Sequence, residues 1–492
     1  MTDTSVDWSA DSNNAVIISL VAPSEGGTKV LHSFNPKMTY SIFGDEERIF
    51  GYQGLRINLK YNACDMRPNL QVNYLKKFKS IGETEPTDVK AIVENYLPKT
   101  AFEKASVFDT AVSDPSYKLW TPPGELYKVI EAGGKNYEVW KGSLADMAIQ
   151  QMLRRIQILV PFFIEGGTFI ELKDPEWSLE RWTVFFLYEK INVPTESSAS
   201  PYIFMGYATI YRYFLFRPKK LHSLDSKQNP NLSAGLDFEL PLSDVSFLDL
   251  PCRSRISQFV ILPPFQGAGN GARFYNALFD FYLNDDHTIE ITVEDPNESF
   301  DDLRDLNDLA RLRKDLDFAA LRISTSVVIR SKGPLPADIV NQEKLDRIRT
   351  AYKIAPRQFA RVTEMQLLSL IPKSVRQSLI IEQPKSTVPD LKTKEYEYHL
   401  WKLLVKQRLY KHNKDMLIQL DRAERVDKLE QTLGAVEADY ARLLRALDEK
   451  MVNNKTAASD VVAKANGKRP PPNDETEENS EPAMKRVRTV EE

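Results

Sequence analysis

Cysteine, histidine and long apolar runs are scarce in this sequence of 492 residues. Its two cysteines, Cys64 and Cys252, lie far apart, which is typical of proteins from a reduced cytosolic or nuclear compartment. The five histidines are scattered without the spacing of metal ligands, so we expect no metal site. No apolar segment follows Met1 and no run of roughly 18 apolar residues occurs, so we expect neither secretion nor a membrane span.

A strong net charge is also missing. The 65 Lys and Arg residues nearly balance the 69 Asp and Glu residues, which leaves a formal charge of −4. This balance argues against direct nucleic-acid binding through bulk charge and is compatible with a basic polypeptide partner. A hydrophobic content of 42% with 24 phenylalanines suits a well-packed globular protein, and the length allows two or three domains.

Composition and periodicity divide the chain into four regions. The first alternates short strand-like runs with turns, the second carries the longest strands, the third is helical by pattern, and the last is rich in Asn, Lys, Pro and Glu. We therefore predict a mixed α/β N-terminal domain at 1–140, an α+β domain at 141–310 with a polar insertion at 217–249, a helical region at 311–450 and a disordered tail at 451–492.

The same patterns predict several individual elements. An apolar stripe at helical spacing, from Met147 to Leu159, predicts one helix over 143–160. The other predicted elements before the centre of the chain are strands at 16–21 and 55–61, a short helix at 88–96, a hairpin over 119–140 around Gly133-Gly134, and strands at 169–172, 182–188 and 202–216.

The segment 256–297 organises the second region. It begins with an apolar strand at 256–262, which two prolines end, and continues through a loop with three glycines at 266–271. Apolar residues recur at helical spacing after the loop, and a second strand at 289–294 alternates apolar and polar residues. The predicted order is therefore strand, glycine loop, helix, strand.

The glycine loop and the helix behind it have the layout of an anion site. Glycines let backbone N–H groups converge without Cβ clashes, and the helix N-terminus adds unpaired N–H groups and a positive dipole end. The loop contains no lysine, so it is not a P-loop. Gly267-x-Gly269-x-x-Ala272 fits a dinucleotide fingerprint, while Gln266-x-x-Gly269-x-Gly271 fits an acyl-coenzyme A loop. A purely structural turn is the third interpretation.

Alternation along the second strand selects a candidate general base. The apolar residues from Ile289 to Val293 share one face, which leaves Glu294 on the other face, at the strand end beside the glycine loop. Asp295 points away unless the strand has already bent at Pro296. A surface glutamate ahead of a proline turn is the competing interpretation.

Beyond these patterns, the residues themselves resemble a known family. The run that carries the resemblance is Ile256 to Leu262 with Pro263-Pro264-Phe265-Gln266-Gly267-x-Gly269-x-Gly271, followed by Ile291-Thr292-Val293-Glu294-Asp295-Pro296. It is similar to the catalytic subunits of type B histone acetyltransferases, members of the GNAT superfamily. Upstream, the resemblance includes Ser41 to Glu47, Phe50-Gly51-Tyr52, Phe163-Ile164-Glu165 and the strand from Gly206 to Tyr213. It covers roughly residues 30–310 and, more weakly, the helices beyond.

The resemblance implies a GNAT acyltransferase fold that transfers acetyl from acetyl-CoA to tail lysines of newly synthesised histone H4, presented with its histone partner. It also implies a β-propeller histone-binding subunit as partner, and residence in the cytoplasm and the nucleus. We expect no direct contact with nucleic acid or membrane. Because Cys64 and Cys252 lie outside the catalytic stretch, we expect direct transfer in a ternary complex.

The resemblance also supports roles for individual residues. Glu294 is expected to be the general base, Glu165 a supporting carboxylate and Asp295 a third member. The backbone of Phe259, Val260 and Ile261 is expected to pair with the pantetheine arm by strand addition. Further cofactor contacts are expected at Gln266, Gly267, Ala268, Gly269, Asn270, Gly271, Ala272 and Asn297. For the peptide, the resemblance points to Asp45, Glu46, Glu47, Trp177, Tyr211, Arg212 and Tyr213.

Three other functions stay open at this point. The first is an acetyltransferase of the same fold that acts on a small amine or another protein. The second is a catalytically silent histone-binding scaffold in chromatin assembly, and the third is a nicotinamide enzyme.

Two charged segments add further hypotheses. Seven carboxylates between 294 and 308 form either a solvated helix face with an acidic first turn or a field that attracts a lysine-rich tail. In the C-terminal tail, Lys468-Arg469 and Lys485-Arg486-Val487-Arg488 resemble a two-part nuclear import signal.

Overall fold

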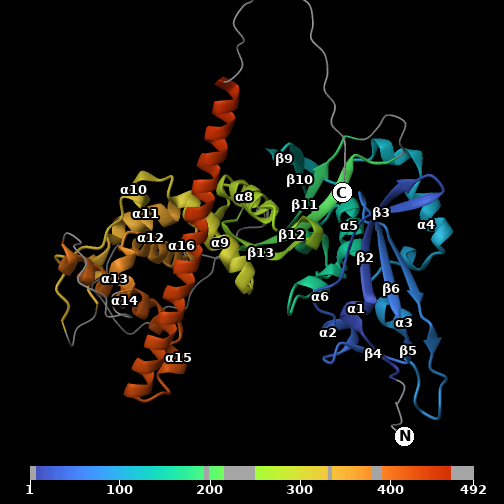
Figure 1. Ribbon diagram of the computed structural model, residues 1–492, viewed down its shortest axis with the longest axis horizontal. Coiled ribbons are helices and arrows are strands. Elements are labelled where there is room, and N and C mark those ends of the chain that lie inside the picture. Colours follow the sequence, from blue (N-terminus) through green and yellow to red (C-terminus); the bar gives the residue numbers. More distant parts are fainter. Residues whose placement is uncertain (1–6, 193–198, 215–249, 331–334, 378–389, 467–492) are drawn as a thin grey trace, which may run out of the picture. The chain divides into compact units, whose positions relative to one another are not determined.

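The computed structural model describes residues 7–192, 199–214, 250–330, 335–377 and 390–466. Strands fill most of the first half of the chain and helices the second (Figure 1), in agreement with the predicted α+β class. Residues 1–433 form one compact unit and residues 434–492 another, of which the structure describes only the end of the last helix.

The N-terminal region is built on a four-stranded sheet in the order β3-β2-β6-β7. The predicted strands at 16–21 and 55–61 are confirmed as β2 and β6, and they pair parallel. Ile18, Leu20 and Leu59 are buried on this sheet. The elements here are β1 Ser9–Asp11, α1 Ser12–Ala15, β2 Val16–Ser24, β3 Gly27–Phe34, α2 Tyr40–Phe43, β4 Arg48–Phe50, β5 Tyr52–Gln53, β6 Arg56–Asn62, β7 Pro68–Asn73, β8 Lys76–Lys77, α3 Val89–Glu94 and α4 Ala105–Val112.

A six-stranded sheet, the central sheet, is built from the middle part of the sequence in the order β14-β13-β12-β11-β10-β9. Its strands are β9 Glu125–Ala132, β10 Lys135–Ser143, β11 Trp182–Lys190, β12 Tyr202–Phe214, β13 Cys252–Ile261 and β14 Thr288–Val293. All neighbours are antiparallel except β13 and β14, which are parallel. The predicted hairpin around Gly133-Gly134 is β9–β10, and both glycines have positive φ, 60° and 73°. The boundary predicted at residue 140 therefore cuts through a strand of this sheet.

Helix α8, Asn270–Leu283, lies beside this sheet (Figure 1). It packs on the sheet through aromatic contacts. The Phe281 ring lies 5.3 Å from Tyr127 and 5.5 Å from Phe185, and Phe274 lies 5.3 Å from Phe259. Such edge-on or tilted aromatic contacts stabilise a core beyond the area that they bury. They fix α8, and with it the glycine loop at its N-terminus, against the sheet.

Helix α5, Met147–Ile156, joins the two sheets. Its Ile149 approaches Gly142 of β10 so closely that a Cβ at this glycine would lie 2.6 Å from the Ile149 side chain. On the other side, Tyr61 of β6 donates a hydrogen bond to the Arg155 carbonyl, 3.0 Å. The N-terminal sheet is thereby fastened to the central one.

Two predictions near α5 are wrong. The single helix expected over 143–160 is two helices, α5 and α6 Leu159–Phe163. The first of them begins only at Met147, because β10 extends to Ser143 and Asp146 caps the start of α5. Met147, assigned to the apolar stripe, is 70% exposed because it is the first residue of the helix. Residues 169–172 form no strand and are irregular, with a turn at residue 172.

The helical region begins with α9 directly after the sheet. Its helices are α9 Glu298–Leu312, α10 Leu316–Ala319, α11 Gln342–Ala351, α12 Pro356–Ser369, α13 Lys373–Gln377, α14 Leu391–His412, α15 Lys414–Leu417 and α16 Arg422–Asn466. Helix α16 continues past Met451, where the change in composition predicted a disordered tail. The predicted insertion at 217–249 and the basic clusters after 467 lie outside the described residues.

The acidic run contributes to the core of this region. Asp305 and Asp308 are buried, and Gln358 of α12 donates to both carboxylates at 2.9 and 3.0 Å. Arg361 pairs with Asp305, and Tyr275 donates to Asp308. Burial raises the pKa of Asp308 to about 6. Both interpretations of the run are therefore wrong for these two carboxylates, which join α9 to α8 and α12.

The helical region also holds the outer edge of β14. The Ile291 N–H donates to the Lys353 carbonyl at 2.7 Å, and Ile291 forms a β-bridge with Ile354. The Lys353 ammonium donates to the carbonyl of Asp285 at 2.8 Å, just after the end of α8. The edge strand of the sheet is thus closed by a segment from the helical region.

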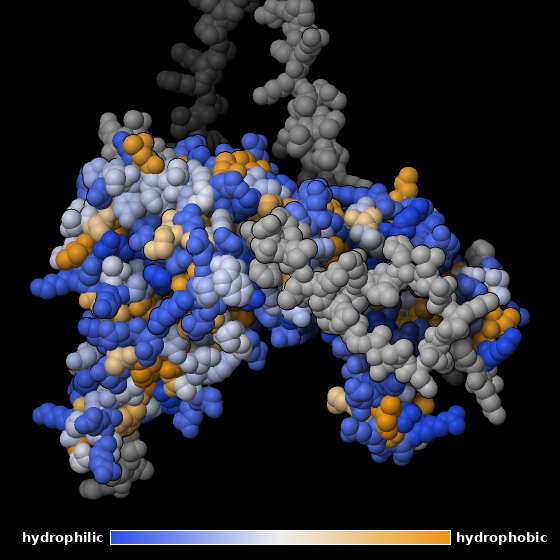
Figure 2. Space-filling view, turned by 180° about the vertical axis from the view of Figure 1, so that it is seen from behind, coloured by the Kyte–Doolittle hydropathy of each residue, from blue (hydrophilic) through white to orange (hydrophobic). Residues whose placement is uncertain are grey.

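Hydrophobic side chains are dispersed on the surface in Figure 2, where they form small patches among hydrophilic residues. Among the described residues, the large hydrophobic side chains with the highest exposure, such as Leu75, Leu119 and Leu316, come from distant parts of the sequence. Isolated exposed hydrophobic side chains of this kind are normal for a folded protein. Among the described helices, none is both long enough and apolar enough to cross a bilayer.

We predict that Arg361→Ala destabilises the protein by about 3–5 kcal/mol, because it leaves the Asp305 carboxylate buried without its cation. The matched control is Arg347→Ala, which removes a pair with Asp317 in which both side chains are largely exposed, 64% and 44%. We expect that change to cost about 1 kcal/mol or less. Urea denaturation followed by circular dichroism compares the two variants, and equal midpoints would contradict a structural role for the buried pair.

Candidate active site

The parallel strands β13 and β14 separate partway along their length. Their pairing runs from Cys252 opposite Thr288 to Ile256 opposite Val293 and ends where the Glu294 N–H donates to the Ile256 carbonyl, 2.8 Å. β13 continues to Ile261 and stays paired with β12 on its other edge. Within the described ranges, no strand pairs with the β14-side edge of residues 257–261. That open edge is the feature required for strand addition.

The predicted glycine loop lies immediately after this edge. Gly267 and Gly269 both have positive φ, 78° and 79°, and Gly269 is the residue that precedes α8. No side chain caps the helix N-terminus, and a Cβ at Gly267 would meet no atom within 4 Å. The Gln266 N–H donates to the Pro263 carbonyl at 3.2 Å, whereas the side of the loop at Gly267 is unobstructed, as an anion site requires.

Two polar side chains of the loop stabilise its conformation. Gln266 donates to the Ile261 carbonyl at 2.7 Å, and buried Asn270 donates to the Phe265 carbonyl at 2.9 Å. In the predicted cofactor strand, Phe259 is half-buried, whereas Val260 and Ile261 are buried, so their backbone is the part available for contact. The predicted cofactor residues from Phe259 to Ala272 thus form one continuous strand, loop and helix start.

The carboxylate of Glu294 lies at the point where the two strands part. Tyr211 donates to its Oε1 at 3.2 Å, Ser257 donates to its Oε2 at 2.6 Å, and the Arg255 Nη2 atom lies 3.7 Å from Oε1. The side chain is 36% exposed, so it is neither buried in the core nor free in solvent. The strand itself ends at Val293, one residue earlier than predicted.

Tyr211 links the proposed base to an aromatic group. Its ring lies 4.7 Å from that of Trp182 on β11, and the Arg181 guanidinium lies 5.5 Å from its centroid. Burial, and then the adjacent Glu294 carboxylate, raise the pKa of Tyr211. The phenol therefore stays protonated near neutral pH and remains a hydrogen-bond donor to Glu294.

The loop that carries Glu165 reaches the same face of the sheet as Tyr211. Gln258 of β13 donates to the Thr168 carbonyl at 2.9 Å, and Gln258 lies opposite Thr209, which shares a face of β12 with Tyr211. Glu165 is exposed within this loop. The segment that carries Glu165 therefore lies on the same side of the sheet as Tyr211, the donor to Glu294.

Asp295 and Asn297 occupy the turn after β14. Asp295 is exposed and has a positive φ of 35°, so the chain bends immediately after Glu294. The Asn297 side chain accepts a hydrogen bond from the Phe300 N–H, 2.9 Å, and caps α9. Asn297 therefore has a structural role, and its contact with a cofactor stays a prediction.

The acidic residues predicted to contact the peptide follow α2. Asp45 and Glu46 are exposed, whereas the Glu47 carboxylate accepts hydrogen bonds from the N–H groups of Thr39 and Tyr40, 2.6 and 3.1 Å. The bond from Thr39 contributes most to the lowered pKa of Glu47. Glu47 thus caps α2, and its two neighbours are the ones that face solvent.

The remaining predicted peptide residues are not all on one face. Trp177, on helix α7 Glu176–Leu179, and Tyr213, two residues beyond Tyr211 on β12, are 61% and 53% exposed. Arg212 lies between the two tyrosines and reaches Asp285 at 3.7 Å, on the opposite face of β12. The structure therefore groups Tyr211 with Tyr213 and separates Arg212 from them.

Sequence reasoning missed Ser257 and Arg255 as neighbours of Glu294. Both lie on β13, where Ser257 is the extra residue of a β-bulge, because Gln258 pairs with Thr209 and Ile256 pairs with Ile210. Because of that bulge, simple alternation along β13 does not predict which side chains reach Glu294. The one local sign that Ser257 could belong to the site was its small hydroxyl within an apolar strand.

Neither cysteine approaches this site. Cys252 is buried at the far end of β13 from Glu294, and Cys64 is buried beside the N-terminal sheet. Burial raises the pKa of both thiols, which makes them poor nucleophiles. Within the described ranges, no cluster of three or more His, Cys, Asp or Glu side chains could hold a metal ion.

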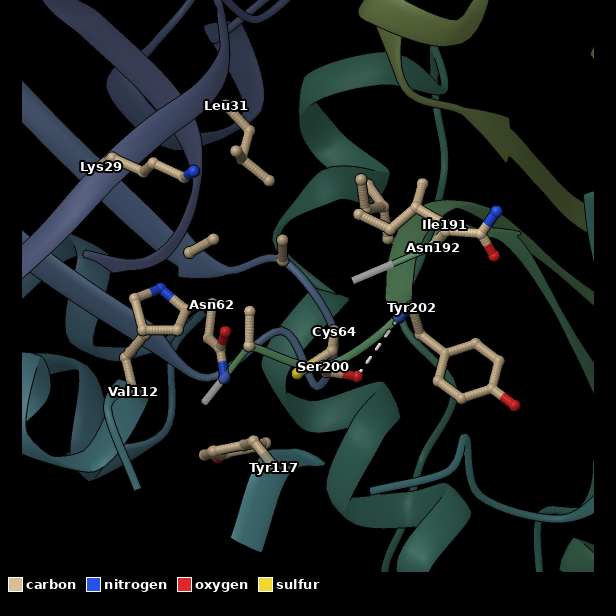
Figure 3. A pocket seen from close by; sticks show the side chains of 15 residues that line it. Lys29, Leu31, Asn62, Cys64, Val112, Tyr117, Ile191, Asn192, Ser200 and Tyr202 are labelled. Atoms are coloured by element: carbon tan, nitrogen blue, oxygen red, sulfur yellow. Dashed lines mark hydrogen bonds between the residues drawn. The ribbon is translucent and has the colours of Figure 1, made fainter. Parts of the chain in front are cut away.

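A separate cavity of about 160 Å³ lies between the N-terminal sheet and the ends of β11 and β12 (Figure 3). Its labelled side chains include Lys29, Asn62, Cys64 and Tyr202. None of the residues predicted for catalysis or cofactor binding lines it. Its size thus has no bearing on the site around Glu294.

The sheet order also bears on the cofactor class. A dinucleotide loop belongs to alternating βα units of a parallel sheet. Here only β13 and β14 are parallel, and the four preceding strands of this sheet form an antiparallel meander. This arrangement favours the acyl-coenzyme A interpretation of the loop.

Comparison with known proteins agrees with the geometry. Residues 8–165 match the family model described as "Histone acetyl transferase HAT1 N-terminus", and residues 305–370 match "Fungal HAT1, C-terminal". A relative from Gibberella zeae is 48% identical over 472 residues, which span 93% of this chain and 95% of the relative.

Two further relatives have similar sequence identity and coverage. The one from Pyricularia oryzae is 46% identical over 89% of this chain and 91% of its own length, and the one from Neurospora crassa is 44% identical over 94% of each. All three are named histone acetyltransferase type B catalytic subunit. The likeness is thus broader than the 30–310 expected from motifs. The chain belongs to the family of type B histone acetyltransferase catalytic subunits.

Proposed function

We propose that this enzyme transfers the acetyl group of acetyl-CoA to lysines in the N-terminal tail of newly synthesised histone H4, presented with its histone partner. The names of the relatives support acetyl transfer to histones. The observation in this chain that carries the proposal is the Glu294 carboxylate, held by two hydroxyl donors beside an unpaired strand edge.

We further infer that the central sheet and its helices are an acyltransferase fold of the GNAT type. An antiparallel meander that ends in one parallel, diverging strand pair supports this assignment. So does a glycine loop that leads from the first of these strands into α8.

Acetyl-CoA fits the groups that this part of the chain offers. The open edge at 257–261 matches the amide-bearing pantetheine arm, and the amides at 267–272 match a diphosphate, since the Gln266 amide is bonded to the Pro263 carbonyl. The space above Gly267 supports this assignment, because a Cβ there would meet no atom within 4 Å. When bound, acetyl-CoA supplies an acetyl group that is already activated as a thioester.

The main chemical obstacle is the protonated state of the acceptor amine. A lysine side chain has a pKa of about 10.4, so about one molecule in a thousand is nucleophilic at neutral pH. Glu294 removes the proton, directly or through a water, while Tyr211 and Ser257 hold its two oxygens. Glu165, whose segment lies on the Tyr211 side of the sheet, is the supporting carboxylate, and exposed Asp295 is the third member.

Direct transfer in a ternary complex is the mechanism that we propose. A covalent route needs a reactive thiol near the acyl group, and both thiols here are buried with raised pKa values. For the peptide, exposed Asp45, Glu46, Trp177 and Tyr213 offer acidic and aromatic contacts to a basic tail.

A β-propeller histone-binding subunit is the proposed partner, and the cytoplasm and nucleus are the proposed locations. These assignments rest on the resemblance and, for the nucleus, on the basic clusters of the tail. An acetyltransferase for another protein or a small amine, or a silent scaffold, remains the alternative.

We predict that Glu294→Gln lowers kcat by about 10²- to 10⁴-fold at neutral pH, because an amide cannot accept the lysine proton. Affinity for acetyl-CoA, measured by calorimetry, should be unchanged. The matched control is Glu298→Gln, an exposed carboxylate in the first turn of α9, which should retain activity. Wild-type turnover in the Glu294→Gln variant would remove Glu294 from this role.

Substrate choice is tested by incubating the pure protein and acetyl-CoA with a soluble histone H3–H4 pair, and separately with spermidine. Mass spectrometry should find acetyl groups concentrated on H4 tail lysines. Preferential acetylation of spermidine would favour the small-amine alternative, and no transfer to either substrate would favour the scaffold.

For localisation, we predict that replacing Lys468, Arg469, Lys485, Arg486 and Arg488 with alanine reduces the nuclear fraction of a fluorescent fusion. Replacing the acidic residues between the two clusters, at 474–478, should leave it unchanged. Undiminished nuclear uptake of the first variant would count against the import signal.

A further inference from the structure

Arg273, in the first turn of α8, folds back over the glycine loop. Its Nη1 atom donates to the Ala268 carbonyl at 2.8 Å and to the Asn270 Oδ1 atom at 2.7 Å. The Cζ, Nη1 and Nη2 atoms all lie 3.7 Å from the position that a Cβ would take at Gly269. The guanidinium therefore lies directly beside the residue at which the loop becomes a helix.

This guanidinium has unused hydrogen-bonding capacity. The two contacts above occupy only Nη1, and within the described part of the chain neither Nε nor Nη2 donates to a protein acceptor or pairs with a carboxylate. Its Cζ atom also lies 5.3 Å from the centroid of the Tyr137 ring, which restrains the group on its other side. A planar, fixed charge with free N–H groups is suited to a phosphate.

The loop itself contains no cation. Between Gln266 and Ala272 there is neither lysine nor arginine, so backbone amides and the helix dipole are its only positive groups. A diphosphate carries more charge than these partial charges balance. Arg273 is the nearest full positive charge in the sequence after the loop.

We propose that Arg273 is a ligand of the cofactor's diphosphate and orients the loop that receives it. This inference rests on the proposed function, because it requires acetyl-CoA to occupy the loop. The contact with Ala268 fixes the loop, and the remaining N–H groups of the guanidinium bind phosphate oxygen. The residue thus raises affinity for acetyl-CoA without taking part in proton transfer.

The test is calorimetric binding of CoA, dephospho-CoA and S-acetylpantetheine to wild type, Arg273→Gln and Arg273→Lys. Loss of one charge-assisted contact should weaken CoA and dephospho-CoA about tenfold in the Arg273→Gln variant and leave S-acetylpantetheine unchanged. The Arg273→Lys variant should recover part of the loss. KM for acetyl-CoA should rise while kcat holds.

A matched control is Arg322→Gln, because Arg322 also donates to backbone carbonyls but lies in a different part of the chain. It should leave all three affinities unchanged. Equal affinity of Arg273→Gln and wild type for CoA would overturn the inference. A loss confined to CoA would overturn it too, since that pattern assigns Arg273 to the ribose phosphate. Failure of wild type to bind CoA would instead refute the proposed function.

Discussion

The separation of β13 from β14 is the constraint on which the site depends. As long as two strands stay paired, their backbone groups are occupied by each other, and neither can receive a ligand. Here the ladder ends at the bond from Glu294 to Ile256, and the chain bends at once through Asp295, with φ of 35°. Phe300 of α9 then packs 5.0 Å from Phe259 of β13. The open edge and the half-buried position of the Glu294 carboxylate are therefore consequences of one turn.

The strand that precedes the proposed general base must itself be held in place. β14 has β13 on one side only, and its other side is closed by Lys353 and Ile354 from the helical region. Glu290 on the same strand lies between Arg253 at 3.1 Å and Arg349 at 3.8 Å. The helical region, which composition alone marks as a separate extension, thus contributes directly to the position of Glu294.

Local patterns predicted the central unit well because its elements are defined by short-range signals. Proline pairs, glycines and apolar periodicity delimit the strand, loop and helix from Ile256 to Leu283. Local patterns could not predict the register in which the strands pair. The bulge at Ser257 and the burial of Asp305 depend on partners roughly fifty residues away, such as Thr209 and Arg361. Such pairings carry no local signature, and Arg273 was overlooked because its role depends on where its side chain folds.

The choice of hydroxyl partners for Glu294 follows from the chemistry proposed for it. A general base alternates between a carboxylate, which only accepts hydrogen bonds, and a carboxylic acid, which also donates one. A lysine or a backbone N–H could satisfy only the first state. Tyr211 and Ser257 each carry a rotating O–H that donates to the carboxylate and can accept from the acid. Both protonation states are therefore satisfied without any movement of the backbone, which keeps the carboxylate in one position throughout the reaction.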